Sequence, residues 1–385
     1  MLPAPDKTKL LVFSYCAIIF TLGIQLGGFQ LALLSAVTEL RIDPAMIGLP
    51  ITAQFLAFSV TPLIFGPVSD RIGKRIIIFV FMIVFIVGCL FVWTSVSAVQ
   101  LLIGSFIIGA GASVNESSVS ASVSDVFIGK QEKYLNFIHG FFCVGAVISP
   151  LILQALMDNL SASWRVNFLI SAIVMAAIIP AILLARTPSA RKASAPAEKQ
   201  SRQKIKLNQP RLFIGFVICV FIYVSVESSI AFFADTVFTI ELNSPAFGAL
   251  AISLFWGSMG AGRLFFGRLR KIPKYTIVVC LFSLALIVFV MILTRHETVM
   301  LTLFALAGFA CSCIWPGMLN AAASLNRDSS GAVFSYLNLG GSIGGAVVPL
   351  AVGIIMAAAN MTASFLFLIA LTLIAGVYIL KKHNQ

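Results

Sequence analysis

Twelve long apolar segments, separated by short polar stretches, make up most of the 385-residue chain. A helix needs ~20 apolar residues to cross the hydrocarbon core of a bilayer, and each segment reaches roughly that length. Backbone polar groups inside hydrocarbon must be paired within their own segment, so the pattern predicts helices rather than loops. The predicted spans are residues 10–36, 47–69, 76–95, 99–122, 134–157, 164–185, 211–234, 245–267, 275–293, 298–324, 331–357 and 361–380.

The composition agrees with a lipid-embedded chain. Hydrophobic residues make up 59% of the sequence, charged residues only 10%, and the mean hydropathy is +1.03. Soluble domains are about 25% charged, and a soluble fold could not cover this much apolar surface with so few charges. The fold class predicted is therefore an all-α, multi-pass integral membrane protein with twelve transmembrane helices.

Lysine and arginine lie almost entirely on one side of the predicted spans. The opposite side holds only Arg41, Arg165 and Arg295, and Arg263 falls inside a span. Cytoplasmic loops carry the excess of basic residues, so both termini are predicted to be cytoplasmic in a cytoplasmic (inner) membrane protein. The net charge of +12 then reflects topology, and no nucleic-acid partner is expected.

The longest polar stretch lies near the midpoint of the chain, at residues 186–210, and reads RTPSARKASAPAEKQSRQKIKLNQP. It is basic, has no apolar period, and predicts a cytoplasmic linker. We expect an N-terminal six-helix bundle at 1–185 and a C-terminal six-helix bundle at 211–385. The basic residues of the linker either contact anionic membrane lipid or simply follow the positive-inside pattern.

An internal repeat supports two related halves. Residues 144–151 read VGAVISPL and residues 343–350 read IGGAVVPL, an offset of 199 positions (343 minus 144). Small residues let helices approach closely, and a proline is tolerated where neighbouring helices satisfy the freed backbone groups. At the same offset, His139 corresponds to Asn338.

The loop between the second and third spans, residues 66–75, reads GPVSDRIGKR. It resembles the G-x-x-x-D-R-x-G-R-K/R signature of the major facilitator superfamily, in the loop where that family carries it. The resemblance implies the major facilitator fold, with two six-helix bundles that expose a site alternately to each side. It also implies a gate between the bundles, formed here by Gly66, Asp70, Arg71, Gly73 and Arg75.

The second half departs from the signature, because residues 262–271, GRLFFGRLRK, lack the acid. The gate is therefore expected to depend mainly on the first-half copy. Further segments look like the fucose:proton symporter branch of the family, which imports sugars. These segments are residues 223–229, 255–263, 315–316, 330–331 and 340–345.

Two acids, Glu116 and Glu227, lie inside predicted spans. A charged side chain at the bilayer centre costs about 2.5–3.5 kcal/mol, so such acids are functional candidates by default. The family resemblance places the fourth and seventh helices at the central cavity. His139 lies at a similar depth to Glu116 and could share a proton with it. We predict proton coupling through Glu116, Glu227 and His139, although an interhelical hydrogen bond also explains the histidine.

Polar and aromatic residues on several of the predicted spans are candidates for solute binding. Amides donate and accept hydrogen bonds, which suits hydroxyl-rich solutes, and an indole can stack on a sugar. Packing or interface anchoring explains each tryptophan as well, and Trp164-Arg165 is interpreted as an interface anchor. The predicted solute ligands are Gln25, Gln30, Asn115, Trp256, Trp315, Asn320 and Asn338.

The predicted function is secondary active transport of a small polar solute such as a sugar, coupled to protons. A proton-driven exporter of drugs or metabolites has the same fold and stays open as the alternative. A membrane transferase would need a nucleophile with a base or a metal cluster, and the three histidines are scattered. A non-transporting sensor is a further alternative. We expect no enzyme activity, cofactor or metal, and a monomer whose partners are the solute, protons and membrane lipid.

Overall fold

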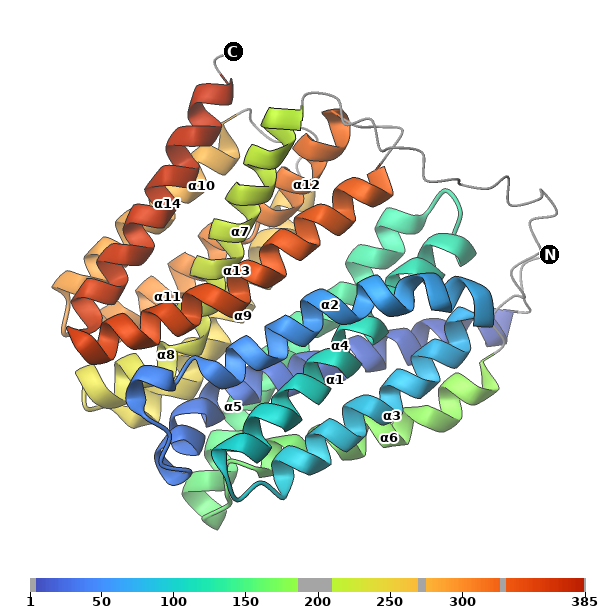
Figure 1. Cartoon of the computed structure of the whole chain (residues 1–385), viewed down its shortest axis with the longest axis horizontal. Coiled ribbons are helices and arrows are strands. Elements are labelled where there is room, and N and C mark those ends of the chain that lie inside the picture. Colours follow the sequence, from blue (N-terminus) through green and yellow to red (C-terminus); the bar gives the residue numbers. More distant parts are fainter. Residues whose placement is uncertain (1–4, 186–209, 269–274, 326–329, 384–385) are drawn as a thin grey trace.

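The computed structural model describes residues 5–185, 210–268, 275–325 and 330–383. These residues are almost entirely helical (Figure 1). Within them, twelve helical spans are long and apolar enough to cross a membrane, which confirms the predicted fold class. The long helices are α1 (Pro5–Glu39), α2 (Leu49–Ile72), α3 (Lys74–Trp93), α4 (Ala98–Val126), α5 (Gln131–Leu160), α6 (Val166–Leu184), α7 (Pro210–Phe232), α9 (Gly248–Arg268), α10 (Thr276–Leu293), α11 (Glu297–Cys311), α12 (Ile314–Leu325), α13 (Ser330–Ala358) and α14 (Met361–His383).

Short helical turns connect some of the spans. They are η1 (Pro44–Met46) before α2, and α8 (Ala234–Thr236), η2 (Val237–Glu241) and η3 (Pro245–Phe247) between α7 and α9. The predicted tenth span consists of two helices, because α11 ends at Cys311 and α12 begins at Ile314. Pro316 explains the break, since proline has no N–H to donate and its ring clashes with the carbonyl four residues earlier.

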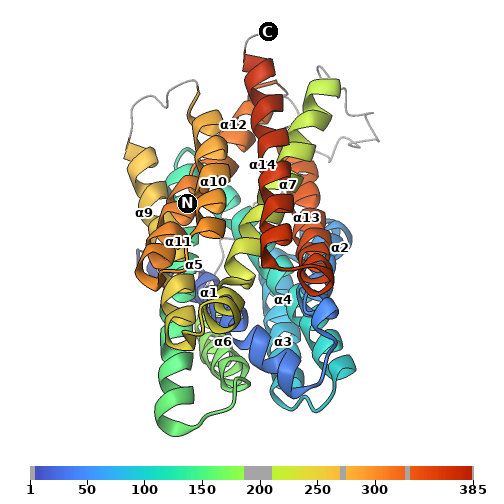
Figure 2. The ribbon, with the colours of Figure 1, turned by 90° about the vertical axis from the view of Figure 1, so that its left-hand side faces the viewer.

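The helices form two bundles that lie side by side (Figures 1 and 2). In the first bundle, α1–α6, the main contacts are α1 with α5 and α6, α4 with α2 and α3, and α3 with α6. In the second bundle, α7–α14, α7 packs on α13, α9 on α11, and α10 on α14. The predicted linker lies outside the described residues, apart from Pro210 at the start of α7, so its limits stay a prediction.

The sequence repeat serves the same packing role in each bundle. A Cβ placed on Gly145 of α5 would lie 2.2 Å from the carbonyl oxygen of Phe20 on α1. A Cβ placed on Gly344 of α13 would lie 2.3 Å from the carbonyl oxygen of Phe221 on α7. Helix α5 therefore packs on α1 as α13 packs on α7, with a glycine at the same repeat position.

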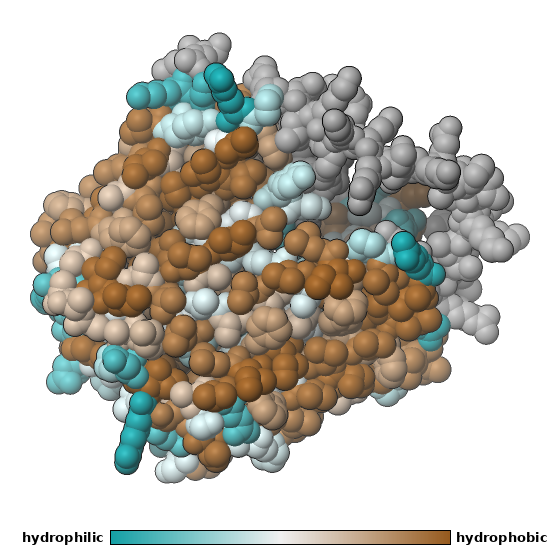
Figure 3. Space-filling model, viewed as in Figure 1, coloured by the Kyte–Doolittle hydropathy of each residue, from teal (hydrophilic) through white to brown (hydrophobic). Residues whose placement is uncertain are grey.

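Apolar side chains cover the outside of both bundles. Figure 3 shows a hydrophobic surface over the lower bundle and over the helices above it, with hydrophilic residues mainly near the ends of the helices. Large exposed hydrophobic side chains include Ile64, Ile173, Leu286 and Ile374. An apolar surface of this extent is expected where hydrocarbon rather than water is the solvent.

The bundles contact each other mainly on the side opposite the chain termini, which we call the far side. The hydroxyl of Thr52 on α2 donates to the carbonyl of Ala346 on α13, at 2.5 Å. A Cβ on Gly48 would lie 2.4 Å from the Cα of Leu350, so the two backbones meet there. The far side is therefore closed by direct contact between α2 and α13.

A second contact joins α5 to α9 and continues toward the side that carries the termini, the terminal side. On its far-side part, the hydroxyl of Ser253 donates to the carbonyl of Val147 at 2.7 Å. A Cβ on Gly257 or Gly260 would have its nearest neighbour at 3.6 or 3.4 Å, and one on Gly140 would meet nothing within 4 Å. Figure 1 shows the bundles diverging in this direction. The structure is therefore closed on the far side and more open on the terminal side.

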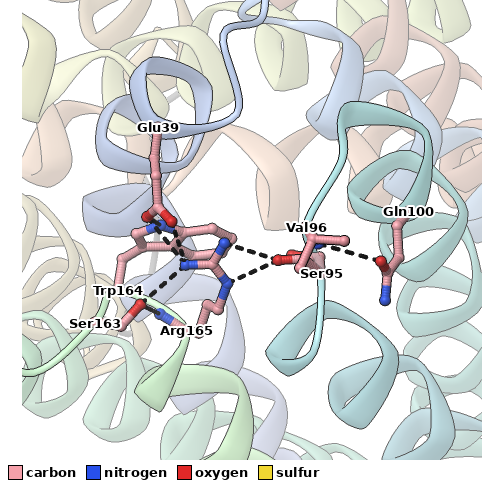
Figure 4. A network of polar contacts seen from close by, with 7 residues as sticks. All are labelled: Glu39, Ser95, Val96, Gln100, Ser163, Trp164 and Arg165. Carbon is pink, nitrogen blue, oxygen red and sulfur yellow. Dashed lines mark hydrogen bonds and ion pairs between the residues drawn. The ribbon is translucent and has the colours of Figure 1, made fainter.

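Arg165 joins the far-side ends of three helices of the first bundle (Figure 4). Its Nη1 donates to the Glu39 carboxylate at the end of α1, at 2.8 Å, and its Nη2 donates to the Ser95 carbonyl after α3, at 2.7 Å. The Trp164 indole also donates to Glu39, at 2.7 Å, and is only 3% exposed. The interpretation of Trp164 as a membrane-interface anchor is therefore wrong, because its ring packs inside the bundle.

Candidate functional site

Glu116 and His139 lie together on the terminal side of the closed contact. Glu116 comes from α4 and His139 from α5, and Glu116 Oε1 lies 3.8 Å from His139 Nδ1. The other ring nitrogen, Nε2, shares a hydrogen bond of 3.0 Å with the Ser120 hydroxyl. The side chains are 34% and 31% exposed, respectively, so both have a free surface although they lie within spans. The structure thus brings this predicted pair together.

Glu227 belongs to the second bundle, on α7, and is also partly exposed. Its carboxylate interacts with the hydroxyl of Tyr223, one turn earlier on the same helix. That hydroxyl donates to the carbonyl of Cys311 at 3.0 Å, where α11 ends. The break between α11 and α12 therefore leaves a carbonyl that α7 satisfies, and this bond fixes the tyrosine beside Glu227.

Arg263 on α9 connects the two sets electrostatically. It lies within electrostatic range of Glu116 and His139 in the first bundle and of Glu227 in the second. Its Nη2 lies 3.4 Å from the sulfur of Met259, and its Nε is buried without a hydrogen-bond partner. The site therefore contains two carboxyl groups, an imidazole and a guanidinium at the boundary between the bundles.

Arg263 was not predicted as a site residue, because in the sequence it stands out only as an exception to the topology pattern. The signal was present, since a charged residue inside a span is expensive and marks a functional candidate in the same way as Glu116. Arg263 also lies in the incomplete second copy of the loop signature, at residues 262–271. That segment was interpreted only through the acid that it lacks.

Three of the predicted amide ligands lie in buried positions. Gln54 Nε2 donates to Gln25 Oε1 at 3.1 Å, and Asn167 Nδ2 donates to the Gln25 carbonyl at 3.2 Å. Asn115 is fully buried and donates to the Gly111 carbonyl of its own helix at 2.8 Å. In this conformation Gln25 and Asn115 therefore belong to the interior of the first bundle, and the third buried amide, Gln30, lies at its boundary.

Gln30 and Trp256 come together across the boundary between the bundles. The indole Nε1 of Trp256 on α9 donates to Oε1 of Gln30 on α1, at 2.8 Å, and both side chains are buried. The Trp256 ring also meets Phe142 of α5 edge-on, with ring centroids 5.5 Å apart. These two predicted solute ligands are paired with each other here.

The remaining predicted ligands lie on the terminal-side parts of α12 and α13. Asn320 is exposed, whereas Asn338 and Trp315 are half-buried. Trp315 packs against α13, since a Cβ on Gly341 would lie 3.5 Å from its ring. These side chains lie on the same side of the closed contact as the charged residues.

The predicted gate loop is held within the first bundle. Gly73, between α2 and α3, has a φ of +99°, a conformation that favours glycine. Arg75 donates to the carbonyls of Ile182 and Leu183 at the end of α6, and Lys74 pairs with Asp125 of α4. Arg71 is exposed, a Cβ on Gly66 would meet nothing within 4 Å, and the side chain of Asp70 lies outside the described residues.

Among the described residues, no three histidine, cysteine, aspartate or glutamate side chains are grouped as metal ligands. The seven cysteines are buried and form no disulfide, although Cys280 Sγ lies 3.2 Å from Cys313 Sγ.

Several curated proteins are similar to parts of the chain. The uncharacterized MFS-type transporter YdgK of Bacillus subtilis is 25% identical over 58% of this chain and 58% of its own length. Multidrug resistance protein D of Escherichia coli is 28% identical over 33% of this chain and 32% of its own. Multidrug resistance protein MdtM of Salmonella typhimurium is 24% identical over 49% and 44%. The matched stretches thus cover less than two thirds of these relatives.

Solved structures match the whole fold at low identity. The human organic anion transporter MFSD10 has a TM-score of 0.72 at 16% identity, covering 98% of this chain and 100% of that one. A bacterial homolog of the lysosomal transporter Spinster, inward-facing and occupied, reaches 0.78 at 13%, covering 98% and 97%. The Escherichia coli fucose:proton symporter reaches 0.68 at 17%, covering 97% and 98%. The fucose symporter is thus one of several neighbours, and these likenesses show the fold alone.

A family model described as the Major Facilitator Superfamily matches residues 12–295 and, in a second match, residues 216–384. Together the two matches span nearly the whole chain, including both bundles and the loop at 66–75. The chain therefore belongs to the Major Facilitator Superfamily of membrane transporters.

Proposed function

We propose that this protein moves a small polar solute across the cytoplasmic membrane together with protons, by exposing one site alternately to each side. One observation carries the proposal. Glu116 and His139 of one bundle are paired, partly exposed and within electrostatic range of Arg263 of the other bundle, on the terminal side of a closed contact. Membership of a transporter family supports the transport part and also the prediction that the chain is not an enzyme.

The charge of the site depends on the protons that it holds. With a neutral imidazole and both carboxyl groups ionised, Glu116 and Glu227 outweigh Arg263 by one negative charge. One proton on either acid balances the set. Charge buried between helices is costly, so protonation changes how readily the bundles close around these side chains. A solute that enters with a proton thereby permits the change of state that carries both across.

The identity of the solute is open between two classes. Import of a sugar or similar polar solute is supported by the amides and by a fold neighbour named as a fucose:proton symporter. Export of drugs or metabolites is supported by two curated relatives named as multidrug resistance proteins. In both cases the positive-inside pattern supports cytoplasmic termini, and no bound cofactor is required.

The test is transport by the purified protein in proteoliposomes, with fucose, gluconate and ethidium as probes and an imposed pH gradient. We expect the gradient to drive accumulation of at least one probe. Glu116→Gln and Glu227→Gln should each lower gradient-driven accumulation by about tenfold or more, because an amide cannot carry the proton. Counterflow, which needs no net proton movement, should be retained better than accumulation.

Asp158→Asn is a matched control, because Asp158 lies at the exposed far-side end of α5, away from the site. It should accumulate the probe as the unmodified protein does. Uptake that ignores the pH gradient would contradict proton coupling. Undiminished accumulation in both glutamine variants would show that neither acid carries the proton.

A further inference from the structure

Arg263 is a cation inside a span, five residues before α9 ends at Arg268, and the described part of the structure gives it no ion-pair partner. Among the described side chains, no carboxylate oxygen lies within 4.0 Å of its guanidinium nitrogens. Its Nε is buried without an acceptor, and the contact of Nη2 is to the thioether of Met259, a weak acceptor. Buried guanidinium groups are normally paired, because an unpaired buried charge is strongly unfavourable.

The position of Arg263 on α9 gives it access to the boundary between the bundles. Gly257 and Gly260 precede it by about two turns and one turn and lie against α5. A Cβ added to either glycine would lie 3.6 or 3.4 Å, respectively, from the nearest atom, which is an ordinary contact, so the two helices leave room there for one further carbon. Arg263 follows on the same helix, and its side chain is partly exposed. A solute entering from the terminal side meets this guanidinium before it reaches the Gln30–Trp256 pair.

The titratable groups within electrostatic range of Arg263 come from several helices. Glu116 lies on α4 and Glu227 on α7, and both act on it only at a distance. The others are His139 and Cys143 on α5, Tyr223 on α7 and Cys311 on α11. When both acids are protonated and the imidazole is neutral, the only remaining full charge in this set is the positive charge of Arg263.

A guanidinium in this setting suits one class of ligand. Its planar fork of N–H donors matches the two oxygens of a carboxylate, and it retains its charge at every physiological pH. Neutral polyols need no cation, and a cationic drug would be repelled by it. We propose that Arg263 binds the carboxylate of a small organic anion, so that the transported solute is an anion rather than a neutral sugar or a cationic drug.

This inference rests on the proposed function, because it requires that the solute enter the site between the bundles. It also gives the acids a role in recognition. Ionised Glu116 and Glu227 compete with an anionic solute for the guanidinium and repel the solute. Protons on these acids remove both effects, so the anion binds more tightly at acidic pH and enters together with the protons.

The experiment compares solutes that differ only in the acidic group. The pairs are gluconate and glucose, lactate and lactamide, and nicotinate and nicotinamide, each added to the detergent-purified protein while thermal unfolding is followed. A ligand that binds the folded state raises the Tm as its occupancy increases. We expect at least one carboxylate to raise the Tm at pH 5.5 more than at pH 7.5, while its neutral twin has no effect.

Three variants locate the effect. Arg263→Gln should weaken binding of that carboxylate by about 10- to 100-fold, the usual range for losing hydrogen bonds to a charged group. Arg263→Lys keeps the charge but not the fork, and should fall between Arg263→Gln and the unmodified protein. Arg211→Gln removes an exposed arginine at the terminal-side start of α7 and should bind as the unmodified protein does. If Arg263→Gln does not fold, the lysine variant and the pH dependence carry the test.

Three results would overturn the inference. They are a neutral twin that binds as tightly as its carboxylate, no Tm shift with any carboxylate of the panel, and equal binding of the carboxylate by Arg263→Gln. Failure of the proposed function looks different. Carboxylates that bind through Arg263 but accumulate without regard to a pH gradient leave this inference standing and remove proton coupling. If the pH gradient drives accumulation of a neutral twin alone, proton coupling stands and the binding of a carboxylate by Arg263 is refuted.

Discussion

Single glycines set how closely the helices of each bundle approach. Gly145 of α5 packs on the Phe20 carbonyl of α1, whereas Gly140, five residues earlier on the same helix, meets nothing within 4 Å. The two positions share the same helix and differ mainly in their neighbours. They therefore separate the effect of packing from the intrinsic helix preference of the residue.

We predict that Gly145→Ala destabilises the protein and Gly140→Ala does not. The new methyl group at 145 would lie 2.2 Å from a backbone oxygen, so α1 and α5 must move apart, at a cost of about 1–3 kcal/mol. At 140 the alanine should be neutral or stabilising by up to about 1 kcal/mol, through better helix propensity. Thermal unfolding of the two variants in detergent measures the difference. Equal melting temperatures would show that this glycine contact is dispensable.

The candidate site was partly predictable from single residues in the sequence. Glu116 and His139 were predicted to meet because both are polar residues at similar depth on spans, and depth follows from position along a helix. The pairing of Gln30 with Trp256 was not predictable, because it depends on how the two bundles are placed against each other. Helix periodicity fixes depth and face, but not the partner in another bundle.

At the scale of the helices, the twelve spans followed from hydrophobicity, since a bilayer imposes length and backbone pairing on each of them. The break between α11 and α12 was not predicted from the sequence, although the Trp315-Pro316 pair lies just after it. A proline can kink a span or interrupt it, and the outcome depends on whether neighbours satisfy the freed carbonyls. Here the hydroxyl of Tyr223 does so at Cys311.

The contact between α1 and α9 should help to keep the far side closed. Trp256→Phe keeps an aromatic ring but removes the N–H that donates to Gln30. A lost hydrogen bond of this kind is worth about 0.5–1.5 kcal/mol, so the open far-side state should gain about two- to tenfold in population. Spin labels at exposed Leu160 and Leu293, on the far-side ends of α5 and α10, should report a larger fraction of long distances.

Trp93→Phe is the matched control for this measurement, because Trp93 lies at the exposed end of α3 and makes no contact between the bundles in the described structure. Its distance distribution should match that of the unmodified protein. An unchanged distribution in Trp256→Phe would show that the contacts of α2 with α13 suffice to close the far side.

For the molecule as a whole, stability should depend on pH through Asp235. This acid lies in α8, between spans and on the far side, and is 7% exposed. Burial raises its pKa to about 7, while a weak hydrogen bond from Thr239 at 3.4 Å acts in the opposite direction. The folded state then holds the proton more tightly than the unfolded state, so stability falls as pH rises from about 4 to 7 and is constant above.

We predict that Asp235→Asn is more stabilising at pH 8 than at pH 5, by about 2–3 kcal/mol, because the amide has no proton to lose. Melting temperatures of the variant and the unmodified protein, measured from pH 5 to pH 8, give this difference directly. Two parallel profiles would show that water reaches the carboxylate in the folded state.

The two-bundle architecture was predictable at this scale, because the repeat at 144–151 and 343–350 and the signature at 66–75 each point to it. The conformational state was not. A single sequence encodes both the state that is closed on the far side and the state that is open there, and the free-energy difference between them depends on many weak contacts. Thr52 and Gly48 show where one state is stabilised, but nothing in their local sequence marks them.

The closed contact between α2 and α13 has a kinetic consequence for inhibitors. On the predicted topology, which places the termini in the cytoplasm, a membrane-impermeant blocker added to the medium meets a sealed face and binds only molecules that have changed state. The rate at which it blocks transport then has a maximum, which equals the rate at which the far side opens. A higher concentration of the blocker does not raise the rate beyond this maximum. A blocker that reaches the cytoplasmic face has no such maximum, so the two routes of application should differ in onset even at equal affinity.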